Sequence, residues 1–202
     1  MPVISAKRMQ DRIDAIVEAA SVTFSTKGFE AASIAEIARA AQVSDGLIYR
    51  YFANKRDLLY RVLQAFYERL LPQVEAQVAQ GVGFEDKLHR LVRRHVEVFV
   101  ADRGLCRLFL TEVRVASDYQ GSAIQDLNRR YTKVLTALIE DGIAKGEVKP
   151  DVSPRLVRDI LFGAIEHLAW PHVNGDARLD VKASAAAVTA LFCGGVCLPV
   201  KA

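Results

Sequence analysis

The stretch SIAEIARAAQVSDGLIYRYF, residues 33–52, decides the fold of this chain. Apolar residues recur through it at spacings of three and four, which predicts helix, but residues 42–44 interrupt the pattern. Ser33 can accept a hydrogen bond from the first turn of a helix, and Glu36 three positions later completes a capping box. The sequence therefore predicts a short helix over 34–40, then a break, then a second short helix.

The second short helix is expected over about 45–52, because Ser44 can cap its start. Two such helices form a helix-turn-helix when small side chains let them cross closely, and Ala38 and Ala41 are placed to do so. Four apolar residues would fill the wedge between the helices: Ile37, Val43, Ile48 and Phe52. We predict a helix-turn-helix at about 33–52.

The remainder of the chain keeps the helical rhythm. Further helices are expected over 9–27, 55–80, 84–101, 105–116, 122–145, 154–170 and 179–193. Gly28 is placed to end the first of them, and Pro171 is expected to end the helix that starts at Pro154. No segment alternates as a strand does. The expected fold is therefore all-α, with about nine helices.

Charge and hydropathy narrow the class of protein. The net charge of +3 permits a nucleic-acid partner without requiring one. Residues 1–60 hold eight Lys or Arg against seven Asp or Glu, so a positive surface would have to be local. The sequence shows neither a signal segment at its start nor an apolar run of membrane-spanning length. We therefore expect a soluble, cytoplasmic protein with no membrane partner.

The three cysteines, Cys106, Cys193 and Cys197, are too few for a disulfide framework. Cys193 and Cys197 would share one face of a helix, where they could pack as small apolar residues, ligate a metal or respond to oxidants. Paired Glu-x-x-His elements, a P-loop, a Gly-x-Ser-x-Gly turn and zinc-type Cys/His spacing are absent from the sequence. We predict no catalytic residue, no metal site and no cofactor, which leaves a helical enzyme as a weak rival.

A longer pattern surrounds the helix-turn-helix. It reads Phe24-x-x-x-Gly28-Phe29, then Ser33-Ile34-x-x-Ile37-Ala38, then Val43-Ser44-x-Gly46-x-Ile48-Tyr49-x-Tyr51-Phe52-x-Asn54-Lys55-x-x-Leu58-Leu59. Over about residues 10–62 this pattern closely resembles the N-terminal domain of the TetR family of transcriptional regulators. The resemblance implies a DNA-binding domain over 1–54 and a helical effector-binding and dimerisation domain over 55–202.

The resemblance also implies which residues contact double-stranded DNA. The third helix would lie in the major groove, and the second helix and the start of the fourth would meet phosphates. The candidates are Ser33, Ser44, Asp45, Gly46, Leu47, Tyr49, Arg50, Tyr51 and Lys55. Taken singly, Tyr49 and Tyr51 could instead cap a core, and Arg50 and Lys55 could be solvated surface charges.

Two residues depart from the family pattern. Gln42 stands where the family usually has glycine in the turn, so a non-glycine residue is expected there at positive φ. Leu47 replaces a small or polar residue, which indicates that this position reads apolar groups such as thymine methyls.

The resemblance implies an effector cavity in the larger domain. Aromatic and polar residues on its apolar faces are the candidates for lining it: Phe99, Phe109, Glu112, Tyr131, Glu166 and Trp170. His95 and His167 also stand in apolar surroundings, where an unpartnered polar group is costly. Segments around 108–114 and 162–167 look faintly like the branch of the family that responds to fatty acids and acyl-CoA.

The last two helices carry apolar residues on more than one face, so they need a second partner. A two-fold interface of four helices would satisfy them. The candidates for this homodimer interface are Leu156, Ile160, Gly163, Val188, Leu191 and Phe192. The resulting expectation is a dimeric repressor that leaves a palindromic operator when a small, largely apolar effector binds. An architectural DNA-binding protein without an effector is the alternative.

Overall fold

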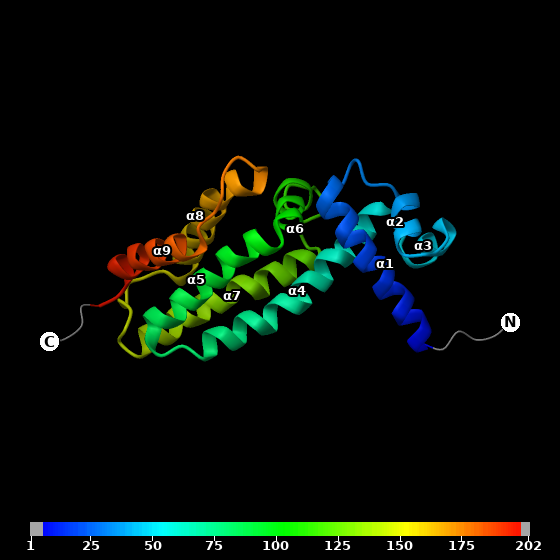
Figure 1. The fold of residues 1–202 in the computed structure, drawn as a ribbon. Coiled ribbons are helices and arrows are strands. Elements are labelled where there is room, and N and C mark those ends of the chain that lie inside the picture. The colour runs from blue at the N-terminus through cyan, green and yellow to red at the C-terminus, as the bar shows by residue number, and fades with distance from the viewer. Residues whose placement is uncertain (1–5, 199–202) are drawn as a thin grey trace. The chain divides into compact units, whose positions relative to one another are not determined.

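The computed structural model describes residues 6–198. Within that range the chain forms nine α-helices and one π-helical turn, and its only strand-like contact is an isolated bridge between Val148 and Cys197. The elements are α1 (Ala6–Lys27), α2 (Ile34–Ala40), α3 (Asp45–Tyr51), α4 (Lys55–Ala79), α5 (Gly83–Ala101), α6 (Arg103–Leu108), η1 (Phe109–Val113), α7 (Ala123–Ala144), α8 (Pro154–Asn174) and α9 (Val181–Val196) (Figure 1). The predicted all-α fold is confirmed. None of the described helices combines the length and apolar character that a membrane span needs.

The chain divides into two compact units. The first consists of Met1–Phe66 and Gly104–Ile124, and the second of Tyr67–Arg103 and Gln125–Ala202. The boundary expected between residues 54 and 55 falls inside the first unit, which takes in the first half of α4 and a segment from the middle of the chain. That segment follows α5 in sequence but makes its contacts with the N-terminal helices.

In the first unit, α1 packs on α2, and α2 packs on α3. The predicted capping box is present, since Ser33 Oγ accepts from the Glu36 amide and Glu36 Oε2 accepts from the Ser33 amide, both at 3.2 Å. Lys27 Nζ also donates to Glu36 at 2.5 Å. The hydrogen bonds that the Glu36 carboxyl makes with Lys27 and then with the backbone and side chain of Ser33 lower its pKa. The start of α2 is therefore fixed both by its own cap and by the end of α1.

Apolar packing sets the crossing of α2 and α3. Ile37 and Ile48 are fully buried, and Ala38, whose small side chain permits a close crossing, is almost fully buried as well. The next helix begins with a reciprocal cap, because Asn54 Oδ1 accepts from the Asp57 amide and Asp57 Oδ2 accepts from the Ala53 amide, both at 2.9 Å. The predicted helix-turn-helix is thus formed by local capping and a few buried apolar side chains.

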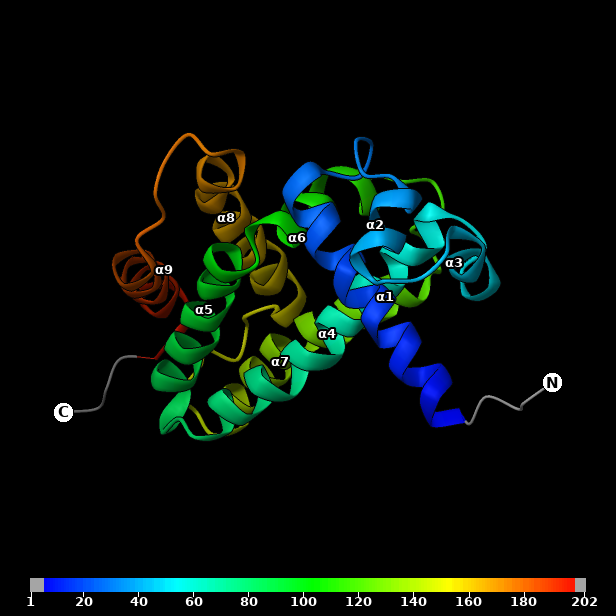
Figure 2. The ribbon, with the colours of Figure 1, turned by 45° about the vertical axis from the view of Figure 1, so that its right-hand side comes forward.

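In the second unit, α5 packs against both α8 and α9, and α8 also contacts α9 (Figures 1 and 2). The end of α9 is tied to the connection between α7 and α8, because the Lys149 amide donates to Val196 at 2.9 Å and the Leu198 amide donates to Glu147 at 3.1 Å. These bonds hold the C-terminal helix along its neighbours.

Two predicted helices differ from the structure. The helix that starts at Pro154 continues through Pro171 to Asn174, because proline removes one N–H without preventing one more turn. It ends at Gly175, whose φ of 95° allows the Asp176 amide to donate to Pro171 at 2.8 Å. The helix expected over 105–116 is two short pieces, α6 and the π-helical η1. A single π-helical turn of five residues is too short to be recognised from the spacing of its apolar residues.

Gln42 is the one non-glycine residue at positive φ in the range 6–198, with φ of 55°. This confirms the expectation for the turn of the helix-turn-helix. An L-residue in the left-handed conformation costs roughly 1 kcal/mol because its Cβ clashes with the backbone. Glycine has no such clash but loses more chain entropy on folding.

We expect Gln42→Gly to leave the free energy of unfolding unchanged or to raise it by up to about 1 kcal/mol. Ala41, with φ of −81°, is the matched control, and Ala41→Gly should lower it by about 0.5–1 kcal/mol. Urea unfolding followed by circular dichroism compares them. A clear loss of stability in Gln42→Gly would contradict the interpretation that Gln42 is strained at positive φ.

Candidate functional site: the α3 surface and its supports

The α3 helix turns most of its side chains away from the protein. Ile48 is the one residue of α3 that is buried, and its side chain packs the helix against the protein. Tyr49 has 57% of its surface exposed, and Arg50 is also exposed and has no ion pair within the described chain. Leu47 and Tyr51 are half-buried. Neither Tyr49 nor Arg50 is therefore part of a core.

The start of α3 is also open. Ser44 has the extended backbone of an N-cap, but its hydroxyl makes no capping hydrogen bond. Asp45 and Gly46 are exposed, and a Cβ placed on Gly46 would meet nothing within 4 Å. Glycine inside a helix costs about 1 kcal/mol relative to alanine. No neighbour within the protein requires glycine here, so its role in a close approach to DNA stays a prediction.

Ser33, at the start of α2, is exposed while its oxygen caps the helix. That oxygen accepts the capping bond, and the Ser33 side chain also hydrogen-bonds to the Glu36 carboxyl. A phosphate contact by Ser33 stays a prediction.

Lys55 differs from the expectation for it. Its ammonium donates to the backbone oxygens of Phe29 at 2.8 Å, Ala32 at 3.1 Å and Glu30 at 3.3 Å, and lies 4.5 Å from the centre of the Phe29 ring. An ammonium has three N–H donors, so all three have acceptors in the protein. In this structure Lys55 holds the connection between α1 and α2 onto the start of α4, instead of offering its charge outward.

A second set of contacts joins α4 to the segment after η1. Arg56 donates to both carboxylate oxygens of Asp118, at 3.0 and 3.2 Å, and to the backbone oxygen of Glu112 at 3.2 Å. Tyr60 donates to the same carboxylate at 2.8 Å. The hydrogen bonds from Tyr60 and then Arg56 lower the pKa of Asp118. The sequence did not reveal this cluster, because its partners lie about 60 residues apart.

The segment Gly104–Ile124 is held at a second point as well. A Cβ on Gly104 would come within 2.6 Å of the Ser25 Cα. Only glycine at position 104 therefore lets α6 approach the end of α1 this closely. This segment is therefore attached to both α1 and α4 of the first unit.

The residues expected to line an effector cavity are divided between the units. Phe109 and Glu112 belong to the first unit, where Phe109 packs edge-on against Tyr119 with ring centres 6.1 Å apart. Phe99 and Tyr131 are buried in the second unit, and Glu166 is half-buried there. Trp170 differs from the expectation, since 40% of its surface is exposed near the end of α8. The lining set stays a prediction.

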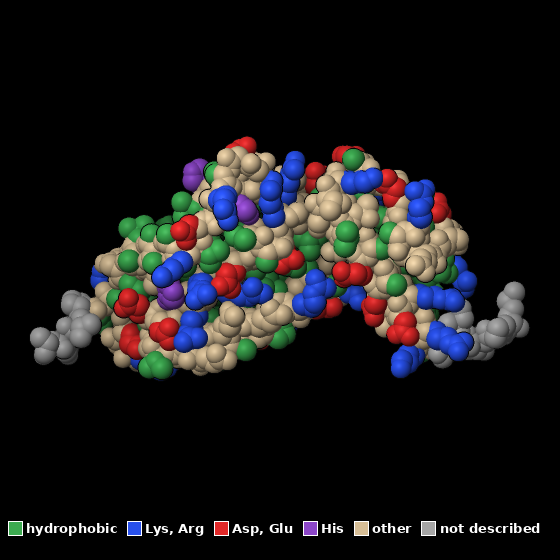
Figure 3. Space-filling model, in the orientation of Figure 1, with side chains coloured by type: hydrophobic (Ala, Val, Ile, Leu, Met, Phe, Trp, Pro, Cys, Tyr) green, Lys and Arg blue, Asp and Glu red, His purple; other side chains and the backbone are tan. Residues whose placement is uncertain are grey.

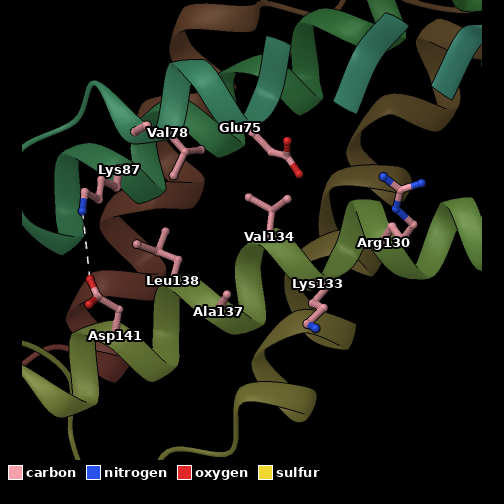
Figure 4. A pocket seen from close by; sticks show the side chains of 10 residues that line it. Glu75, Val78, Lys87, Arg130, Lys133, Val134, Ala137, Leu138 and Asp141 are labelled. Atoms are coloured by element: carbon pink, nitrogen blue, oxygen red, sulfur yellow. Dashed lines mark ion pairs between the residues drawn. The ribbon is translucent and has the colours of Figure 1, made fainter. Parts of the chain in front are cut away.

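A groove of about 530 Å³ lies in the second unit along α4 and α7. Figure 4 shows Glu75 and Val78 of α4 facing Val134 of α7, with Lys87 of α5 paired to Asp141 at 4.0 Å. The groove is open to solvent and carries charges of both signs. It is thus unlike an enclosed, mainly apolar effector cavity.

The expected homodimer face is largely exposed. Leu156 and Ile160 of α8 are exposed, Leu191 of α9 has 75% of its surface exposed, and a Cβ on Gly163 would meet nothing within 4 Å. Hydrophobic side chains are visible at the surface along α9 in Figure 3. Val188 was expected at this interface, and that prediction is wrong, because only 6% of its surface is exposed and it packs inside its own chain. Phe192 is half-buried.

An exposed short helix, anchored by one buried residue at the end of a helix-turn-helix, defines a DNA-binding protein of the helix-turn-helix class. The model of bacterial regulatory proteins of the tetR family matches residues 16–62, and that of the tetracyclin repressor-like C-terminal domain matches residues 81–196. The chain belongs to the TetR family of transcriptional regulators, as the sequence pattern indicated.

Similar proteins share nearly the whole length of the chain. The fatty acid metabolism regulator protein of Bacillus subtilis is 25% identical over 94% of this chain and 98% of its own. The structure of the fatty acid degradation regulator FadR from Bacillus halodurans is 30% identical, with a TM-score of 0.79 over 90% of this chain and 98% of that one. FadR from Bacillus subtilis in complex with stearoyl-CoA is 26% identical, with a TM-score of 0.81 over the same shares.

Lys55 and Arg50 offer a direct comparison of an internal and an external cation. Lys55→Ala should lower the free energy of unfolding by about 1–2 kcal/mol, because it removes charge-assisted hydrogen bonds. It should leave the salt dependence of DNA binding unchanged. Arg50→Ala should leave stability unchanged and reduce the slope of log affinity against log salt by about one unit.

Thermal unfolding and fluorescence anisotropy at several salt concentrations measure both quantities. A stable Lys55→Ala variant whose salt slope falls by one unit would return Lys55 to the set of phosphate contacts.

Proposed function

We propose that the chain is a dimeric repressor that binds a palindromic operator through α3 and is released from it by an acyl-CoA. The observation that carries the DNA-binding part is the exposure of α3 around its single buried anchor, Ile48. The acyl-CoA part rests on the likeness to FadR in complex with stearoyl-CoA over 90% of the chain.

The side chains of α3 suit a division of tasks at the major groove. Arg50 carries an unpaired charge that can reach a phosphate or a guanine edge, and the Tyr49 hydroxyl can donate to a phosphate while its ring covers a thymine methyl. Leu47 adds an apolar contact next to Gly46, where the backbone can come close. Phosphate contacts from Ser33 and Ser44 would set the register of the helix.

The surface of the second unit supports the proposed dimer. Leu156, Ile160 and Leu191 are large apolar side chains exposed on α8 and α9, the two helices that contact each other. A two-fold axis would pair this surface with its own copy and bury it. Two recognition helices would then meet half-sites one helical turn apart, about 34 Å.

Release requires coupling between the effector and α3. The chain passes between the two units three times, after Phe66, after Arg103 and after Ile124. The segment between the last two points is bonded to α4 through Arg56 and Asp118. An effector that shifts these connections would displace α4 and with it α3. A coupling free energy of about 1–3 kcal/mol would weaken operator binding 5- to 150-fold.

Stearoyl-CoA should therefore weaken binding of the full chain to an operator obtained by selection from random DNA, and coenzyme A alone should not. Fluorescence anisotropy of labelled DNA measures the release, and emission of Trp170, the single tryptophan, reports binding of the ligand. An architectural protein without an effector would bind DNA equally without ligand, with coenzyme A and with stearoyl-CoA. No change in anisotropy or emission at tens of micromolar stearoyl-CoA would overturn the acyl-CoA proposal.

The dimer is tested separately. Leu191→Glu should convert the protein to a monomer in light scattering at micromolar concentration, because a charge at the centre of an apolar interface is costly to bury. Val115→Glu is the control, since Val115 is equally exposed but lies in the first unit. A wild-type chain that is already monomeric would refute the dimer.

A further inference from the structure

His95 of α5 lies in an aromatic cluster of the second unit. The centre of its ring is 4.7 Å from that of Phe162, 5.3 Å from that of Phe99 and 5.5 Å from that of Tyr131. Tyr67 continues the cluster, with its ring centre 6.1 Å from that of Tyr131. These rings carry no formal charge, so the cluster is an apolar environment in which each polar atom needs a partner.

One nitrogen of His95 has such a partner. Nδ1 lies 2.7 Å from the hydroxyl of Tyr131. A phenol is a stronger acid than a neutral imidazole N–H, and an imidazole nitrogen is a stronger acceptor than a phenol oxygen. Tyr131 therefore donates and Nδ1 accepts. Burial lowers the pKa of His95 to about 3, so the ring is neutral and its one proton is on Nε2.

The other nitrogen has none. Nε2 is shut off from solvent and has no hydrogen-bond partner among residues 6–198. Most buried polar side-chain atoms are hydrogen-bonded, and one that is not destabilises the fold by more than a formed bond contributes. His95 thus presents an N–H donor inside an aromatic cluster, with nothing in the described chain to accept from it.

We propose that His95 is the polar anchor of the effector site and that Nε2–H donates to the thioester carbonyl oxygen of a long-chain acyl-CoA. This inference rests on the proposed function and adds to it the ligand atom that the protein recognises, the thioester carbonyl oxygen. A carbonyl is the fitting acceptor because it is neutral. A free carboxylate would lose its hydration among Phe99, Phe162 and Tyr131, none of which can neutralise it. The site therefore selects a thioester over the corresponding fatty acid.

The test compares two ligands that differ in this oxygen. Stearoyl-CoA and its thioether analogue, S-octadecyl-CoA, are titrated into the full-length wild-type chain by calorimetry. We expect the thioether to bind about tenfold more weakly, equivalent to 1.4 kcal/mol. Equal affinities would overturn the role of His95 while leaving stearoyl-CoA as the effector. If the wild type binds neither ligand, the acyl-CoA proposal fails and this inference fails with it.

Two variants assign the difference to His95. His95→Phe keeps an aromatic ring without the donor and should bind both ligands with the lower affinity. His95→Gln keeps an N–H near the position of Nε2 and should restore most of the preference for the thioester. A His95→Phe variant that still distinguishes the ligands would refute the assignment. Should His95→Phe fail to fold, the wild-type comparison and the glutamine variant still decide.

The tautomer has its own measurement. In the free protein, nitrogen NMR of histidine-labelled chain should show the His95 proton on Nε2, and this signal should shift downfield with stearoyl-CoA but much less with the thioether. Operator binding, measured in parallel without ligand, shows that the protein is active. A proton on Nδ1, or equal shifts with both ligands, would contradict the proposal.

Discussion

The burial of one isoleucine on each of two crossing helices supports the rest of this structure. Ile37 of α2 and Ile48 of α3 are both fully buried, and Ala38 lets the two helices approach. Because Ile48 is the only buried residue of α3, the orientation of that helix depends on the burial of this side chain. The same geometry that buries Ile48 turns Tyr49 and Arg50 outward. The burial of Ile48 thereby determines which side chains of α3 are exposed.

Polar contacts then fix the helix-turn-helix to its surroundings. Lys55 draws the connection after α1 onto α4 through three backbone oxygens, and Arg56, the next residue, binds Asp118. Adjacent residues thus hold α4 at two places, one toward the DNA-binding helices and one toward the segment Gly104–Ile124. The family relationship alone did not indicate that Asp118 binds Arg56.

Capping and turn chemistry explain why much of the fold could be predicted. Ser33, Glu36, Gly28 and Asn54 act through residues at most four positions away, so their effects are visible in the sequence. The helix ended by Gly175 was misjudged because Pro171 was given too much weight, and η1 was missed because a single π-helical turn of five residues is too short to leave its own spacing in the sequence. Among the candidate site residues, the exposed side of α3 was implied by the family resemblance. The direction of the Lys55 side chain did not.

The sequence by itself determined the helices, the helix-turn-helix and the family, because these depend on periodicity, caps and a dense local motif. Only the tertiary structure decided that Val188 faces the interior of its own chain, that Arg56 meets Asp118 and that His95 stands among three aromatic rings. Such contacts join residues that are far apart in the chain, and their partners are chosen by packing. Local pattern carries no information about which distant side chain fills the remaining space.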